Sequence, residues 1–135
     1  NELGSRAALV IHGAGGTDEL SLFGPNRVSH LQDGAVRTYE LDPTDYGLPR
    51  ATIADLRGGD PDQSAQMMRD LFSGKLTGAR RNAVLLNTAG TLSAETGDFK
   101  AALAEAEASL SSGAALAKMN QLVEFSQSFA QPSAL

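Results

Sequence analysis

The chain has 135 residues, no cysteine and a formal net charge of −5 at pH 7, which gives a pI of about 4.9. These values exclude a disulfide framework and thiol chemistry, and they argue against a nucleic-acid surface, which needs clustered basic groups. Apolar runs are too short to cross a bilayer and the first residues lack a secretory pattern. We therefore expect a cytoplasmic protein with one α/β domain over residues 1–130 and a tail over 131–135, binding neither membrane nor nucleic acid.

The first predicted element is a strand over residues 7–11, an unbroken apolar run with the sequence Ala-Ala-Leu-Val-Ile. Such a run, ended by glycine, is typical of a strand that is buried on both faces in a parallel sheet. One parallel strand cannot bury itself. We expect the remaining sheet to come from another part of a longer protein, from a partner chain or from self-association.

Two adjacent acids, Asp18 and Glu19, follow this strand after a glycine-rich turn. Ligands of open α/β sheets sit where the chain leaves the carboxyl ends of the strands. The pair fits Mg²⁺, which keeps several waters and takes one or two protein carboxylates together with substrate phosphates. The spacing alone favours another interpretation, in which Thr17 caps a helix and the acids stabilise its first turn.

A β-hairpin is predicted around Asp33-Gly34, a pair that suits a two-residue type I′ turn. Counting outward pairs Leu31 with Val36 and Val28 with Tyr39, on opposite faces of the hairpin. Neither face is strongly apolar, so we expect an outlying hairpin.

Two histidines have structural and functional interpretations. His12 ends the strand beside the acids, where it could hold a phosphate or orient Asp18. A hydrogen-bonded histidine at the strand tip is favoured, because no nucleophile accompanies it. His30 lies in the hairpin, where we expect an ordinary exposed residue.

Four helices are predicted after a short extended piece near Ile53. Asp60-Pro61 gives the first a capping residue and a proline at its first position, and Gly74 ends it. The second runs from about 79 to 93 and is apolar over a wide arc, with Asn87 as a structural residue that needs hydrogen-bond partners. Gly97-Asp98 opens the third, Gly113 stops it, and the fourth is amphipathic.

Taken in order, several segments resemble the carboxyl-terminal part of the anthranilate phosphoribosyltransferases, within the superfamily of nucleoside phosphorylases. The similarity begins with the Leu-Val-Ile-His-Gly and Gly-Thr-Asp-Glu-Leu-Ser segments over residues 9–13 and 16–21. It continues through Asp-Tyr-Gly-Leu at 45–48, Gly-Gly-Asp at 58–60 and Ala-Val-Leu-Leu-Asn at 83–87.

The resemblance implies Mg²⁺-dependent transfer of a phosphoribosyl group from phosphoribosyl pyrophosphate to anthranilate, in tryptophan biosynthesis. It assigns the metal to Asp18 and Glu19. The chain lacks the family's Gly-Thr-Gly-Gly-Asp phosphate loop, its Lys-His-Gly-Asn-Arg segment and its helical amino-terminal domain. No catalytic residue can therefore be assigned. We expect activity only with the missing amino-terminal half, in cis or in trans, and we expect a homo-oligomer.

Three alternatives accompany this prediction. The first is a nucleic-acid-binding relative without catalysis, which the acidic pI disfavours. The second is a fragment or scaffold without activity, which the missing phosphate loop favours for the isolated chain. The third is a pyrimidine nucleoside phosphorylase, which does not fit the pair of acids.

Overall fold

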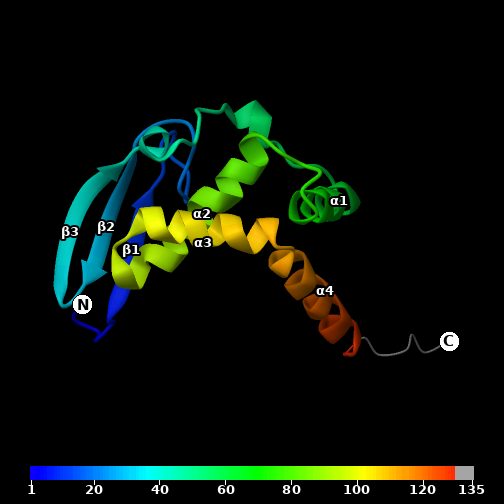
Figure 1. Ribbon diagram of the computed structural model, residues 1–135. Coiled ribbons are helices and arrows are strands. Elements are labelled where there is room, and N and C mark those ends of the chain that lie inside the picture. Colours follow the sequence, from blue (N-terminus) through cyan, green and yellow to red (C-terminus); the bar gives the residue numbers. More distant parts are fainter. Residues whose placement is uncertain (130–135) are drawn as a thin grey trace.

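The structure is a computed structural model, and it describes residues 1–129. It is a mixed α/β fold in which the strands come first and the helices follow (Figure 1). The strands are β1 (Ala7–His12), β2 (Asn26–Gln32) and β3 (Ala35–Leu41). Two 3-10 turns, η1 (Pro43–Tyr46) and η2 (Ile53–Leu56), lead to helices α1 (Pro61–Phe72), α2 (Ala79–Thr96), α3 (Phe99–Ser111) and α4 (Ala114–Gln127). The extended piece expected near Ile53 is thus a 3-10 turn.

The three strands form an antiparallel sheet in the order β1-β2-β3, so the expectation that residues 7–11 form a parallel strand is wrong. β1 runs against β2 from the pair Ala7 and Gln32 to the pair His12 and Arg27. The chain reverses between them through a loop without a helix, whereas parallel neighbours need a crossover, usually helical. The expected burial on both faces is also wrong, because Val10 on the outer face is 70% exposed.

The hairpin of β2 and β3 has the register that the sequence predicts. Asp33 and Gly34 have φ angles of 50° and 73°, as a type I′ turn requires. Leu31 pairs with Val36, and Val28 pairs with Tyr39. The expectation of an outlying hairpin is wrong for β2, which is the middle strand, and holds only for β3 at the edge.

Helix α2 covers the inner face of the sheet and also contacts α3, which makes it the most buried helix, as its wide apolar arc predicts. Alternate residues of β2 face the helix, among them Val28 and His30. The main core unites this face with α2, α3 and two loops. Its buried members are Leu20, Leu22, Val28, Leu41, Leu48, Leu86, Ala89, Phe99 and Ala102.

The helix ends follow the local signals of the sequence. Asp60 accepts a hydrogen bond from the amide of Gln63 at 2.8 Å, and Pro61 begins α1. Asp98 accepts from the amide of Ala101 at 2.9 Å and begins α3. Gly97 ends α2 with a φ of 73°, which residues with a side chain rarely adopt.

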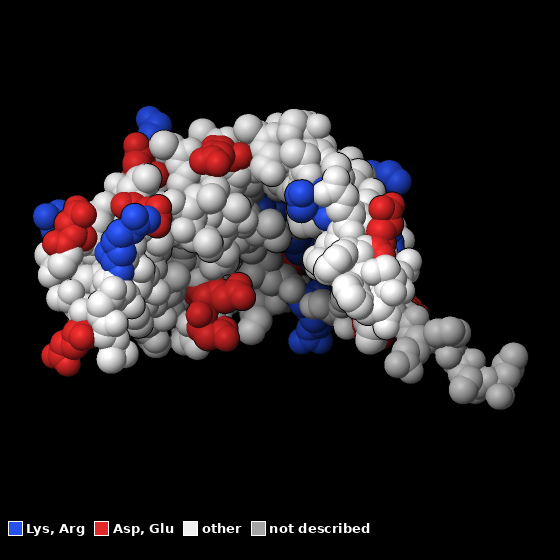
Figure 2. Space-filling model, turned by 90° about the horizontal axis from the view of Figure 1, so that it is seen from below, with Lys and Arg blue, Asp and Glu red and all other residues white. Residues whose placement is uncertain are grey.

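Helices α1 and α4 lie beyond the end of the sheet and form an arm that is set apart from the body of β1–β3, α2 and α3 (Figure 1). α4 contacts α3 and α1, and it has no buried residue among those described. Figure 2 shows a hollow between the body and the arm, with basic side chains inside the hollow and acidic and basic side chains on the surface around it.

None of the helices in residues 1–129 combines the length and apolarity that a membrane crossing needs. The single domain over 1–130 and the tail over 131–135 stay predictions, because residues 130–135 lie outside the described part of the chain.

Candidate functional site

The acids lie on the loop that joins β1 to β2, and this loop folds back on itself before it reaches them. The amide of Gly13 donates to the carbonyl of Thr17 at 2.9 Å. A Cβ at residue 13 would come within 2.1 Å of both the Glu19 carbonyl oxygen and the Thr17 Oγ1, so only glycine fits. No helix forms at residues 17–21, and the helix-cap interpretation of Thr17 is therefore wrong.

The Asn26 side chain holds the base of this loop. It is fully buried, and its Oδ1 accepts from the amides of Ala14 and Ser21 at 3.1 and 2.8 Å. Its Nδ2 donates to the carbonyls of Ser21, Gly24 and Leu41 at 3.0 to 3.2 Å. One buried amide thus bonds backbone groups of the loop and of β3 and ties the two together.

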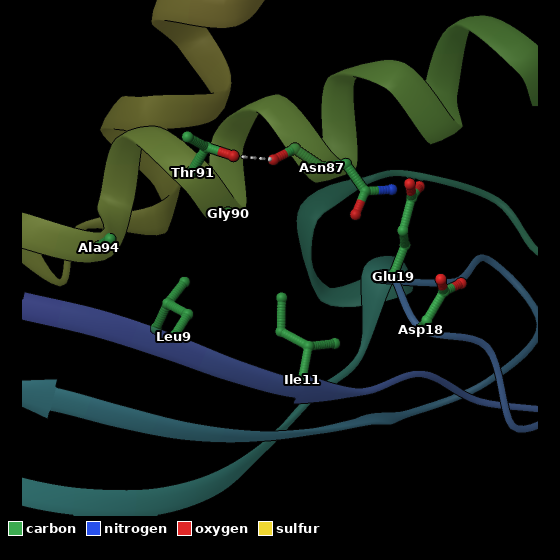
Figure 3. A pocket seen from close by; sticks show the side chains of 8 residues that line it. All are labelled: Leu9, Ile11, Asp18, Glu19, Asn87, Gly90, Thr91 and Ala94. Carbon is green, nitrogen blue, oxygen red and sulfur yellow. Dashed lines mark hydrogen bonds between the residues drawn. The ribbon is translucent and has the colours of Figure 1, made fainter.

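Asp18 and Glu19 lie beyond the end of β1, beside a pocket of about 390 Å³ between β1 and α2. Figure 3 shows both side chains extending from the loop toward the side of the pocket that α2 forms. The pocket is lined by Leu9, Ile11, Asp18, Glu19, Asn87, Gly90, Thr91 and Ala94. The site therefore has an apolar floor on the strand, small and polar groups on the helix, and its charge at one end.

The chemistry of these donors fits a hard divalent cation. Both acids are exposed, and neither carboxylate accepts a hydrogen bond from any residue in the range 1–129. No cluster of three or more histidine, cysteine or acidic side chains that could hold a metal occurs in this range. Two carboxylates suit Mg²⁺, which fills its remaining positions with water and phosphate oxygens, better than zinc, which takes three or four protein ligands.

The structure separates the two histidines from the acids. His12 is exposed on the outer face of the sheet, and it makes no side-chain hydrogen bond within residues 1–129, contrary to the favoured expectation. His30 is 7% exposed, and its Nε2 lies 2.7 Å from the Ala94 carbonyl of α2, so the expectation of an exposed hairpin residue at this position is wrong. Its ring fastens β2 to the last turns of α2.

Sequence reasoning missed Asn26 and the burial of His30. Asn26, Val28 and His30 alternate on β2 and share the inner face, so the period of two contained a usable signal. The polar side chains of Asn26 and His30 concealed this signal, because a buried polar residue cannot be told from an exposed one until its partners are known. Asn87 is as expected: its side chain is hydrogen-bonded to the backbone of Leu20 and Ala83.

Comparison with known proteins places the chain in a family of transferases. Residues 1–116 match the model described as "Glycosyl transferase family, a/b domain", so the chain belongs to this family. Within it, the chain is similar to proteins named anthranilate phosphoribosyltransferase, as the sequence segments imply. The protein from Moorella thermoacetica is 45% identical over 130 residues, covering 95% of this chain and 38% of the relative. That from Parvibaculum lavamentivorans is 46% identical over 123 residues, covering 90% of this chain and 36% of the relative.

Solved structures agree with this assignment. The anthranilate phosphoribosyltransferase of Thermus thermophilus superimposes with a TM-score of 0.80 at 36% identity, over 92% of this chain and 36% of its own. The Saccharomyces cerevisiae enzyme in complex with PRPP and Mg gives a TM-score of 0.78 at 25% identity, over 91% and 36%. The chain thus spans little more than a third of the length of these relatives.

Proposed function

We propose that this chain is the metal-holding segment of an anthranilate phosphoribosyltransferase, in which Asp18 and Glu19 bind Mg²⁺ together with the diphosphate of phosphoribosyl pyrophosphate. The observation that carries the proposal is the pair of adjacent carboxylates, free of protein hydrogen bonds in residues 1–129, at the mouth of the pocket between β1 and α2. The names of the relatives and the yeast complex with PRPP and Mg support the same reaction.

The residues of this chain would act by holding charge in place. Ionised carboxylates at 18 and 19 would bind the cation directly or through its waters, and the Asn26 bonds would keep their loop in shape. When bound, the ion neutralises negative charge that develops on departing pyrophosphate oxygens. The proposed reaction asks for no nucleophile from this chain, because the acceptor amine would attack the sugar itself.

The remaining parts of the site belong to the proposal as well. The chain spans 38% of the Moorella relative, and phosphate-loop segments of the family are not found in its sequence. We expect the amino-terminal half, anthranilate and phosphoribosyl pyrophosphate as partners of the whole protein, in a cytoplasmic homo-oligomer. We expect the isolated chain to be inactive and activity to return when the amino-terminal half is supplied in trans.

The test uses the complete protein that contains this segment, with phosphoribosyl transfer measured across a magnesium titration. We expect Asp18→Asn and Glu19→Gln to raise the magnesium concentration for half-maximal activity by at least about tenfold, the lower range seen when groups around a bound metal are removed. Stability should change little, because both acids are exposed.

Glu40→Gln is the matched control, since Glu40 is an exposed acid on the edge strand β3, away from the pocket. It should leave the titration unchanged. Identical magnesium curves for both acid variants and the unchanged protein would refute the metal assignment.

A further inference from the structure

The residue that follows the acids, Leu20, is gripped by α2 at both its backbone and its side chain. The Leu20 amide donates to Asn87 Oδ1 at 2.9 Å, and Asn87 Nδ2 donates to the Leu20 carbonyl at 2.9 Å. The orientation of the Asn87 amide follows from its partners, because two carbonyls and one amide surround it and only one end can accept. The Asn87 side chain thus bonds both backbone groups of Leu20, as a residue of a neighbouring β-strand can.

Gly90, one turn further along α2, makes room for the side chain of Leu20. A Cβ at this position would lie 2.8 Å from Leu20 Cδ1, so the absent side chain leaves a notch that the Leu20 side chain fills. Leu20 is only 3% exposed and belongs to the main core. Asn87 and Gly90 therefore form a socket on one face of α2 that fixes both the backbone and the side chain of Leu20.

By holding Leu20, the socket also restrains the residue that immediately precedes Leu20 in the chain. Glu19 is bonded covalently to Leu20, and its carboxylate shares the pocket with the Asn87 side chain (Figure 3). No other side-chain hydrogen bond in residues 1–129 ties this end of the loop to a helix: Asn26 holds Ala14 and Ser21, on either side of the acids, to the sheet. The position of the acids relative to α2 thus depends on Asn87.

We infer that Asn87 is a positioning residue for the acid pair: by binding both backbone groups of Leu20, it sets the place of Asp18 and Glu19 beside the pocket. This inference rests on the proposed function of the acids as metal ligands. Asn87 itself has its oxygen and nitrogen engaged with backbone groups and is not offered as a ligand. Rigid placement matters because an ill-positioned carboxylate must be reordered before it can bind the ion.

The experiment uses the 135-residue chain, Mn²⁺ as the probe and NMR as the readout. Asn87→Ala removes the tether, and Leu85→Val is the control, because Leu85 is a buried residue of α2 outside the core cluster that contains Leu20. Asn87→Gln keeps an amide but displaces it by one methylene, and it serves if the alanine variant does not fold. Paramagnetic broadening gives the Mn²⁺ dissociation constant, hydrogen exchange reports on the Leu20 amide, and urea unfolding measures global stability.

We expect both Asn87 variants to speed exchange at Leu20 by roughly tenfold, because two hydrogen bonds are lost. Their Mn²⁺ dissociation constants should rise by about tenfold, as for other groups that orient ligands. The control should lose stability and keep its Mn²⁺ affinity. Unchanged exchange at Leu20, or equal affinities of Asn87→Ala and Leu85→Val, would overturn the inference alone. Absence of broadening around Asp18 and Glu19 in the unchanged chain, with Mn²⁺ and phosphoribosyl pyrophosphate both present, would overturn the proposed function as well.

Discussion

The body and the arm both contain helices with apolar faces, yet these faces are buried to different extents. In the body, α2 buries Leu85, Leu86 and Ala89, each of which is at most 1% exposed. In the arm, Met68 of α1 and Leu122 of α4 are 52% and 65% exposed. The contrast shows that amphipathic patterning specifies a helix and its apolar face, and that burial of this face depends on a cover that lies elsewhere.

A second contrast follows from the first. The body holds the candidate site, and its loop is held by the buried Asn26 amide and the half-buried Asn87 amide, whereas the arm contributes no residue to the pocket beside the acids. Clefts beside α1 and α4 are lined mainly by apolar side chains such as Met68 and Phe72. The candidate site thus belongs to the body, and the arm leaves apolar side chains exposed.

The largest expected effect on stability comes from a substitution in the core of the body, and the matching substitution in the arm should have little effect. Leu86→Ala should lower the free energy of unfolding by about 2–5 kcal/mol, because it opens a cavity at a fully buried position. Leu122→Ala should change it by no more than about 0.5 kcal/mol, as is usual at exposed sites. Urea unfolding followed by circular dichroism measures both. Similar losses for the two variants would contradict the division into body and arm.

An intermediate effect should stay within the arm. Asp60→Ala removes the cap of α1 and the reciprocal bond with Gln63, which costs about 1 kcal/mol at a helix start. Hydrogen exchange should quicken in α1 and remain unchanged in α2, because the two helices share few contacts. Asp98→Ala is the comparison in the body, where the core around Phe99 should spread the loss over α2 and α3. Equal quickening in α2 for both variants would show one cooperative unit.

The smallest effect concerns acid stability at the edge of the body. Hydrogen bonds from the Thr44 hydroxyl, Arg50 and the Thr44 amide lower the pKa of Asp42 from 3.8 to about 2. A carboxyl whose pKa is depressed by folding stabilises the native state above its unfolded pKa, and that contribution is lost as pH falls through the folded value. Asp42→Asn should therefore be less stable than the unchanged chain at pH 6, with the difference vanishing between about pH 4 and pH 2. Thermal unfolding across this range measures the difference, and a gap that persists at pH 2 would exclude the carboxylate as its source.

The sequence predicted those features that local chemistry determines. The Asp33-Gly34 turn fixed the register of the hairpin, and Asp60 with Pro61 located the start of α1. The direction of β1 could not be predicted, because an apolar run indicates a strand and does not reveal which strand lies beside it.

The candidate site, too, could be predicted from the sequence only in part. Asp18 and Glu19 could be selected from their position after a strand and from a family resemblance, and the structure adds the pocket beside them. The side-chain hydrogen bonds of Asn26 and Asn87 join residues that are up to 67 positions apart in the sequence, and no rule of residue spacing predicts such contacts. Long-range polar contacts are therefore the part of the site that requires the structure.

The five bonds of Asn26 have a consequence for how molecules enter the site. They fasten the two ends of the acid loop and the end of β3 to one buried amide, so that none of these segments can swing outward alone. Moving the base of this loop outward would break the bonds to Ala14, Ser21 and Gly24 at a position that water does not reach, and the buried Asn26 amide would lose those partners. Any opening of the site at this end has to come from residues 15–19, which lie between Ala14, held by Asn26, and Leu20, held by Asn87.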